Sequence, residues 1–320
     1  MEALLAESRR IIARGSQSFA LAARLFDRRT RDRALLLYAW CRHCDDAIDG
    51  QTLGFTPEQP DAAVQAERLQ QLYDLTRAAL AGEPQREPAF QCLQRVVREC
   101  DIPERYPLEL LDGFAMDVRG ARHRELEDTV RYCYHVAGTV GAMMARIMGV
   151  DDQATVLRGI HLGIGFQLSN IARDVLDDAR LGRVYLPESW LEAEQVEPTP
   201  AGVRAGQDRV VRVTHRLLDA AEPYYASARE GIDLLPLRSA WAVETAARVY
   251  YEIGSVVRAR GTAAWASRAR VGSARKLALL AAAGAGVTRG RLRGGAQEPV
   301  DLSALWDPAA TDPGRYASKR

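Results

Sequence analysis

Residues 167–178 read Gln-Leu-Ser-Asn-Ile-Ala-Arg-Asp-Val-Leu-Asp-Asp and close a long apolar segment of the chain. In this segment the hydrophobic residues recur at intervals of three and four, which is the spacing of a buried α-helix. Asp174 and Asp178 are four residues apart and therefore share one helix face, with about 5–6 Å between their β-carbons. Two carboxylates at the end of a buried helix suit a divalent cation that is shared with a ligand.

A second acidic cluster follows another apolar run, where residues 42–49 read Arg-His-Cys-Asp-Asp-Ala-Ile-Asp. Asp45 and Asp49 have the same spacing of four. Such pairs arise by chance, so the interpretation depends on context: each short window holds three Asp at the end of a helix apolar enough to be buried. Two such ends would repel each other strongly in the absence of a cation. The plainer alternative, exposed acids at helix ends, stays open on the spacing alone.

The ligand types in these clusters indicate which metal would bind. Carboxylates and the Asn170 amide are hard oxygen donors, which favour Mg²⁺ or Mn²⁺. Mg²⁺ usually completes its coordination shell with water and phosphate oxygens, so the implied ligand is a phosphate or diphosphate ester. Arg42, Arg173 and Arg183 lie close by in the sequence and are candidates to bind its oxygens. Surface ion pairing is the alternative role for each arginine.

The helical periodicity extends over almost the whole chain and leaves no obvious place for strands. The pattern predicts helices over residues 2–13, 18–26, 30–49, 61–80, 89–100, 107–118, 128–148, 152–180, 206–231, 237–260 and 273–284. Residues 182–200 are expected to form a longer connection, and Pro223 is expected to kink its helix. No repeat or linker divides the chain. We expect one helical domain over residues 1–289 and a poorly ordered tail over residues 290–320.

Composition excludes several functional classes. The formal net charge of the 320-residue chain is +1, which argues against general binding of nucleic acid. No apolar run is long enough to span a bilayer, and the N-terminal residues lack the pattern of a secretory signal, so we expect a cytoplasmic protein. Five cysteines fit reduced thiols better than a disulfide framework. The Cys41/Cys44 pair has no partner pair for zinc, and the scattered histidines form no hydrolase triad.

Small residues mark two further segments, residues 132–145 and 159–166. Gly and Ala three or four residues apart allow either tight helix packing, the commoner use, or an apolar slot for a slender hydrocarbon. Helices of this kind that run into two acidic clusters would form a long apolar pocket with a metal-diphosphate mouth. A prenyl diphosphate has the shape that such a pocket requires.

At these motifs the sequence resembles the squalene and phytoene synthase family of head-to-head prenyl transferases. The resemblance covers about residues 16–280 and rests on four ordered motifs. They are Ser16-Gln17-Ser18-Phe19, Tyr38-Ala39-Trp40-Cys41-Arg42 with Asp45 to Asp49, the segment from Tyr132 to Gly141, and the segment from Gln167 to Asp178 with Gly182-Arg183-Val184-Tyr185-Leu186-Pro187. The resemblance implies a single all-α isoprenoid-synthase helical bundle with a central active-site cavity.

The resemblance also implies roles for individual residues. Metal would be held by Asp45, Asp49, Asn170, Asp174 and Asp178, and the four carboxylates would be catalytic together with Tyr134. Substrate binding would involve Ser18, Phe19, Tyr38, Arg42, Gly138, Gln167, Arg173, Arg183 and Tyr250. The aromatic members of this set are expected to face carbocations, although each also fits a plain core position. His43 stands where an arginine is frequent in the family, so no diphosphate contact is assigned to it.

The activity implied is phytoene synthase: an NADPH-independent condensation of two geranylgeranyl diphosphates through a cyclopropylcarbinyl diphosphate, in carotenoid biosynthesis, with Mg²⁺ or Mn²⁺. One alternative is a dehydrosqualene or squalene synthase that uses farnesyl diphosphate. An alternative of another class is a non-catalytic helical assembly or binding protein, which would have no need of the four acids. The expected partners are two prenyl diphosphates and, for release of an insoluble product, a peripheral contact with a membrane. The sequence leaves the oligomeric state open.

Overall fold

The computed structural model describes residues 2–15, 17–50, 61–293 and 306, and among these residues every regular element is a helix. The elements in chain order are α1 (Glu2–Gly15), α2 (Gln17–Ala23), α3 (Arg28–Asp49), α4 (Ala62–Leu80), α5 (Pro88–Cys100), α6 (Arg105–Val118), α7 (Leu126–Cys133), the π-helix η1 (Tyr134–Gly138), α8 (Thr139–Ile147), α9 (Gln153–Arg180), α10 (Glu188–Ala193), α11 (Pro200–Ala205), α12 (Gln207–Ile232), α13 (Leu237–Arg260), α14 (Ala263–Ala266) and α15 (Ser273–Arg293). The predicted all-α class is confirmed.

Local capping explains where the two helices of the acidic motifs begin and end. Asp27 caps α3 by accepting hydrogen bonds from the amides of Arg29 and Thr30, and Gly50 ends it with a φ of 63°, a conformation that glycine adopts without strain. Asp152 caps α9 in the same way at the amide of Thr155. The 28 residues of α9 make it about 42 Å long, so one helix reaches from one end of the bundle to the other.

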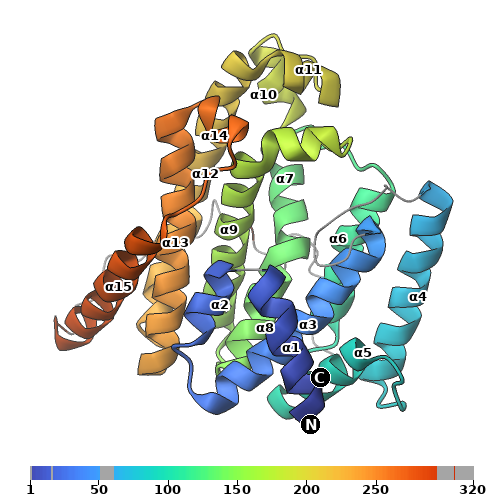
Figure 1. The fold of residues 1–320 in the computed structure, drawn as a ribbon, viewed down its shortest axis with the longest axis vertical. Helices are drawn as coiled ribbons and strands as arrows, with labels where there is room; N and C mark the ends of the chain where they lie inside the picture. The colour runs from blue at the N-terminus through green and yellow to red at the C-terminus, as the bar shows by residue number, and fades with distance from the viewer. Residues whose placement is uncertain (1, 16, 51–60, 294–305, 307–320) are drawn as a thin grey trace.

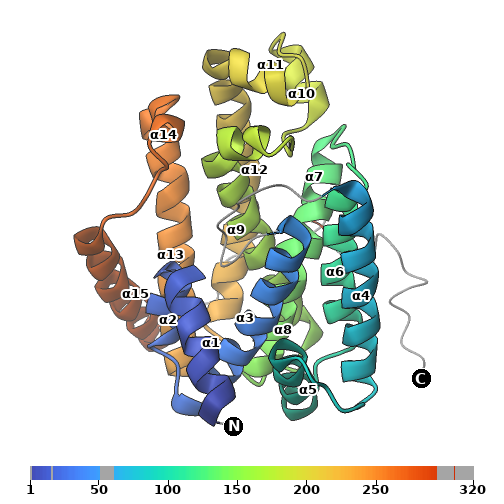
Figure 2. The same ribbon diagram turned by 45° about the vertical axis from the view of Figure 1, so that its right-hand side comes forward.

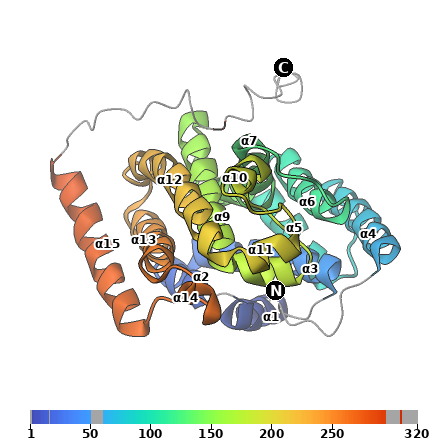
Figure 3. The same cartoon turned by 90° about the horizontal axis from the view of Figure 1, so that it is seen from above.

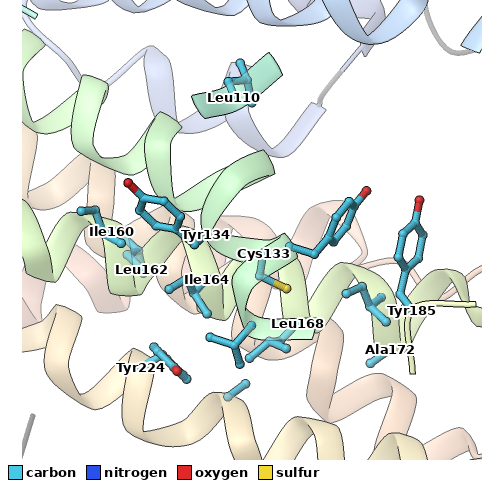
Figure 4. Close-up of a cluster of buried hydrophobic side chains, with 14 of the residues drawn as sticks. Leu110, Cys133, Tyr134, Ile160, Leu162, Ile164, Leu168, Ala172, Tyr185 and Tyr224 are labelled. Carbon is cyan, nitrogen blue, oxygen red and sulfur yellow. The ribbon is translucent and has the colours of Figure 1, made fainter. Parts of the chain in front are cut away.

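Helix α9 is the centre of the bundle and packs against η1, α8, α12 and α13 (Figure 1). Viewed from above, α15 and α4 lie at opposite edges with α9 between them (Figure 3). Helices α10, α11 and α14 gather at one end, where α9 finishes, and the turn between α12 and α13 lies at the other end (Figure 2). One large apolar cluster joins these elements, and Figure 4 shows part of it, with Cys133 and Tyr134 between Leu110 of α6 and residues Ile160 to Leu168 of α9.

The structure corrects several predicted boundaries. The helix expected over residues 128–148 is divided into α7, η1 and α8, and the connection expected over residues 182–200 contains α10. The short helices α11 and α14 were not predicted, and α15 continues past residue 284 to Arg293. Helix α12 is assigned as one helix across Pro223. The tail expected from residue 290 falls largely outside the described residues.

Within the described part of the tail, Trp306 contacts the bundle. Its amide donates to the Tyr224 hydroxyl at 3.2 Å, and its carbonyl is 3.1 Å from Nε2 of the buried His161. The five cysteines are free thiols, as the sequence predicts. No helix among the described residues is both long enough and apolar enough to cross a membrane.

Candidate active site

The candidate site is a cavity of about 320 Å³ that runs along α9 in the middle of the bundle. Small and apolar side chains make up most of its wall. The lining includes Ala22, Phe26, Ala34, Leu37, Tyr38, Cys41, Val136, Ala137, Val140, Gly141, Met144, Ala145, Met148, Thr155, Arg158, Gly159, Leu162, Gly163, Phe166, Gln167, Asn170, Ala228, Gly231, Ile232, Leu235, Ala242, Val243, Ala246 and Tyr250. A slot with this lining accepts a slender hydrocarbon chain and keeps water away from it.

The small-residue segments, residues 132–145 and 159–166, take part both in tight helix packing and in the cavity wall. A Cβ on Gly141 would lie 2.1 Å from the carbonyl oxygen of Gly159, and one on Gly163 would lie 2.2 Å from that of Ala137. Backbone therefore meets backbone along the line where α9 contacts η1 and α8. The two alternatives considered for these segments are both present, because the same helices that touch through glycine also form one wall of the cavity.

The cavity becomes polar toward the C-terminal ends of α3 and α9. Tyr38, Gln167, Asn170 and Tyr250 line it there, and the Asn170 amide donates to Gln167 at 3.2 Å. The Tyr250 ring stacks on Phe166 with 4.1 Å between centroids. On α9, Asp174 and Asp178 follow Asn170 by about one and two helical turns, and on α3, Asp45 and Asp49 follow Tyr38 by about two and three. We call this end of the cavity the mouth.

On α3, arginine side chains partner the acids of the mouth. Arg42 lies 3.2 Å from Asp45 and donates to Asp46 through Nε and Nη2, at 3.0 and 2.8 Å. Burial raises the pKa of Asp45 to about 6, although Arg42 acts in the opposite direction. Asp49 accepts a hydrogen bond of 2.6 Å from Arg183, which follows α9 in the chain. This contact joins the end of α3 to the end of α9.

On α9, two guanidinium groups hold Asp174. Arg173 and Arg268 each donate through two nitrogens, and both contacts of Arg268 measure 2.8 Å. Burial alone would raise the pKa of Asp174, but these guanidiniums outweigh it and the pKa is lowered. Asp178 has the opposite balance: burial and the charges of Asp174 and Asp117 raise its pKa well above the usual value, against the influence of Arg183.

Behind the mouth, a largely buried group of three polar side chains influences the charge of Arg183. Tyr132 and Tyr185 stack at 4.6 Å and both donate to Asp117, at 3.0 and 2.8 Å. Burial opposes the charge on Arg183, yet Tyr185, Asp117 and Asp49 raise its pKa above the usual value. Arg183 therefore stays cationic between the two acidic clusters, bonded to one and electrostatically coupled to the other.

The donor set at the mouth fits a hard divalent cation that is bound jointly with a ligand. Within the described ranges, no three acidic, histidine or cysteine side chains converge closely enough to hold a metal without help. The Asn170 amide nevertheless lines this end of the cavity, the four carboxylates follow at the C-terminal ends of α3 and α9, and burial leaves Asp45 and Asp178 with raised pKa values. A cation would relieve this cost of burying negative charge, and diphosphate oxygens would supply the missing ligands.

The remaining predicted site residues lie away from the cavity lining or outside the described side chains. Tyr134 is buried and its hydroxyl donates to the buried Glu109. Gly138 forms part of the helix contact, since a Cβ added to it would lie 3.1 Å from the Ile160 side chain. Ser18 and Phe19 belong to α2, and their side chains are outside the described structure.

The sequence did not point to Arg268. This arginine lies outside α9 and donates two hydrogen bonds to Asp174. It follows α14, and the nearby Trp265 donates to the Ala172 carbonyl of α9 at 3.0 Å. The two contacts fasten the segment after α13 to the acidic end of α9. Arg268 does not belong to any motif, so nothing in the sequence distinguishes it from the many other arginines.

The sequence and the fold are similar to those of known proteins. Residues 12–275 match the family described as squalene/phytoene synthase. The chain is 50% identical to the 15-cis-phytoene synthase of Pantoea ananas over 91% of its length and 94% of that protein, and 47% identical to the phytoene synthase of Pseudescherichia vulneris over 93% and 97%. A crystal structure of a dehydrosqualene synthase in complex with ligand has a TM-score of 0.77 at 24% identity, covering 92% of this chain and 98% of the other; at that identity it supports the fold alone.

Proposed function

This chain belongs to the squalene/phytoene synthase family, and we propose that it is a phytoene synthase, a prenyl transferase that condenses two geranylgeranyl diphosphates head to head. The observation that carries the proposal is the order of features along the bundle: a small-residue apolar cavity ends in polar residues, and four acids follow at the C-terminal ends of α3 and α9, where four arginines form ion pairs with carboxylates. Four relatives at 46–50% identity over at least 90% of this chain are named phytoene synthase.

Arginine side chains at the mouth would bind the two diphosphates. Arg42, Arg173, Arg183 and Arg268 now pair with carboxylates, and each guanidinium can turn its fork onto phosphate oxygens. Asp45, Asp49, Asn170, Asp174 and Asp178 would hold Mg²⁺ or Mn²⁺, which when bound supplies the positive charge that eases departure of the leaving diphosphate.

The reaction then proceeds inside the apolar part of the cavity. Departure of one diphosphate leaves an allylic cation, which the 2,3 double bond of the second substrate attacks, and proton loss gives a cyclopropylcarbinyl diphosphate. Departure of the second diphosphate, rearrangement and loss of another proton give phytoene, so no reductant is consumed. The stacked rings of Phe166 and Tyr250 and the ring of Tyr38 line the cavity beside the mouth, where their π-faces would stabilise the cations.

The cavity wall would protect these cations from water. Its lining between the mouth and the far end is almost wholly apolar, apart from Thr155 and Arg158. Arg158 is held by an ion pair with Glu230 and donates to the Ser227 carbonyl at 3.1 Å, so its charge is engaged at the wall. A dry, shaped cavity favours rearrangement over capture by water.

The test is to incubate the purified protein with Mg²⁺ and, separately, geranylgeranyl or farnesyl diphosphate, and to identify the extracted hydrocarbon by mass. We expect a forty-carbon product from geranylgeranyl diphosphate without NADPH. A thirty-carbon product alone would assign the chain to dehydrosqualene or squalene synthesis. Failure to form product from either substrate, together with no thermal stabilisation by a prenyl thiodiphosphate and Mg²⁺, would favour a non-catalytic role.

A further inference from the structure

The far end of the cavity borders a second hollow at the surface. This open groove of about 780 Å³ lies between the loop after α8 and the turn that joins α12 to α13. Met148, Thr155 and Leu235 line both the groove and the cavity. The two spaces are therefore neighbours, at the opposite end of α9 from the mouth (Figures 1 and 2).

Two exposed leucines lie at or next to this groove. Leu234 lines the groove and is 68% exposed, and Leu237, the first residue of α13, is 52% exposed. Among the described residues only five large hydrophobic side chains are exposed, so this short segment holds two of the five. One exposed leucine needs no explanation, but a pair beside the closed end of an apolar cavity indicates a contact with apolar material.

The surroundings of the turn are basic. The C-terminal end of α15 lies beside the turn, where Arg291 donates to the Leu235 carbonyl, and the last turns of this helix carry Arg289, Arg291 and Arg293 and no acidic residue. Arg238 follows Leu237 and is exposed. Two of the three acids in the groove are engaged, because Asp151 pairs with Arg146 at 2.5 Å and Asp152 caps α9. The third, Asp233, faces the last turns of α15.

We propose that the groove is the exit for the hydrocarbon product and that Leu234 and Leu237 insert into the surface of a lipid bilayer with anionic headgroups. The proposal rests on the proposed function, since it requires a product that dissolves in lipid and not in water. Met148, one of the three residues that line both spaces, is unbranched and flexible, so in this proposal its side chain would move aside as the product passes. Exposed apolar side chains combined with neighbouring arginines are the pattern that binds anionic membrane surfaces.

The test compares the full chain with two variants in co-sedimentation with vesicles of phosphatidylcholine and phosphatidylglycerol. The double variant Leu234→Asp/Leu237→Asp should bind at least about tenfold more weakly, because it replaces inserted apolar groups with charges that the headgroups repel. The matched control is Leu277→Asp, which alters a leucine that is 62% exposed near the other end of α15. It should bind as the unchanged protein does.

A kinetic readout separates product release from chemistry. Single-turnover condensation should be equal in all three proteins, whereas the acceleration of steady-state turnover by vesicles should be lost in the double variant alone. Equal vesicle binding by the double variant and the unchanged protein, or an equal loss in Leu277→Asp, would overturn the proposal. Absence of any hydrocarbon product from the unchanged protein would instead refute the proposed function, so the two failures are distinguishable. Unchanged thermal midpoints would show that both variants are folded.

Discussion

The two ends of the cavity are built from the same helices but follow different physical rules. At the mouth, the ends of α3 and α9 gather acids whose mutual repulsion is offset by Arg42, Arg173, Arg183 and Arg268. In the apolar part, α9 touches its neighbours through glycines, and the charge that it carries there, on Arg158, is paired with Glu230. The contrast indicates that the acids of the mouth favour ligand binding and lower the stability of the fold. The apolar part of the cavity instead favours close helix packing.

Catalysis should respond most strongly to a change at the mouth. Asp178→Asn should lower turnover by more than about 100-fold, which is the loss that even an outer-shell partner of a metal can cause. Because burial and like charges raise the pKa of Asp178, removing its charge should also raise the thermal midpoint at neutral pH. Turnover and thermal unfolding of the same preparation test both parts.

The matched control is Asp177→Asn, since Asp177 is the next residue and pairs with Arg180 on the exposed side of α9. It should retain nearly full turnover and an unchanged midpoint. If Asp178→Asn unfolds at a lower temperature than Asp177→Asn, the idea that the buried acids of the mouth destabilise the fold is wrong.

A smaller effect than the loss of turnover at the mouth is expected where α9 contacts η1 and α8 through backbone, and this effect is on the stability of the fold. Gly163→Ala places a Cβ 2.2 Å from the Ala137 carbonyl oxygen, so the helices must separate, and we expect a loss of about 3 kcal/mol in the free energy of unfolding. Denaturant unfolding measures it. Gly165→Ala is the control on the same helix, where the new atom lies 3.3 Å from the Tyr225 ring and the loss should be about 1 kcal/mol or less. Equal losses would mean that backbone contact is not what holds this wall.

The weakest of these effects concerns the pH dependence of the metal-free protein. Burial raises the pKa of Asp45 from its usual 3.8 to about 6, so the proton on this group stabilises the fold fully below about pH 4 and that stabilisation is lost as pH rises through about 6. The unchanged protein should therefore lose stability relative to Asp45→Asn across this window. The side chain is 40% exposed, so water reduces the difference. Denaturation at a series of pH values checks it, and a difference that does not vary with pH would be evidence against the raised pKa.

The helices were predictable from the sequence where a helical pattern of hydrophobic residues continues over many positions. Candidate site residues were predictable where they lie close together in the sequence. Helices α3 and α9 were expected within two residues of their ends, because buried apolar faces and capping residues mark them. The π-helix η1 was missed because one extra residue per turn leaves the composition unchanged, and α10, α11 and α14 are too short to show a period. Arg268 was missed because only folding brings it to Asp174, 94 positions away in the chain.

Tyr134 shows the opposite limitation. Its motif implies a catalytic role, which stays a prediction, and the structure places its ring in the core with the hydroxyl donating to Glu109. A motif records that a residue type belongs at a position and not whether the side chain faces ligand or neighbouring helix. Gln167, Asn170 and Tyr250 were expected at substrate or metal and do line the cavity, and for these the roles stay predictions until ligand is bound.

The backbone contacts at Gly141 and Gly163 have a consequence for how this pocket is able to diversify. A wall made of touching backbones accepts almost no substitution, so inherited change in pocket size has to accumulate on the facing wall. Ala34 on α3, Ala228 on α12 and Ala242 on α13 stand there with ordinary side chains that lengthen or shorten one mutation at a time. The cavity thus has one wall whose shape is fixed by backbone contacts and a facing wall whose side chains are able to change. Attempts to alter the accepted substrate length are best confined to the facing wall.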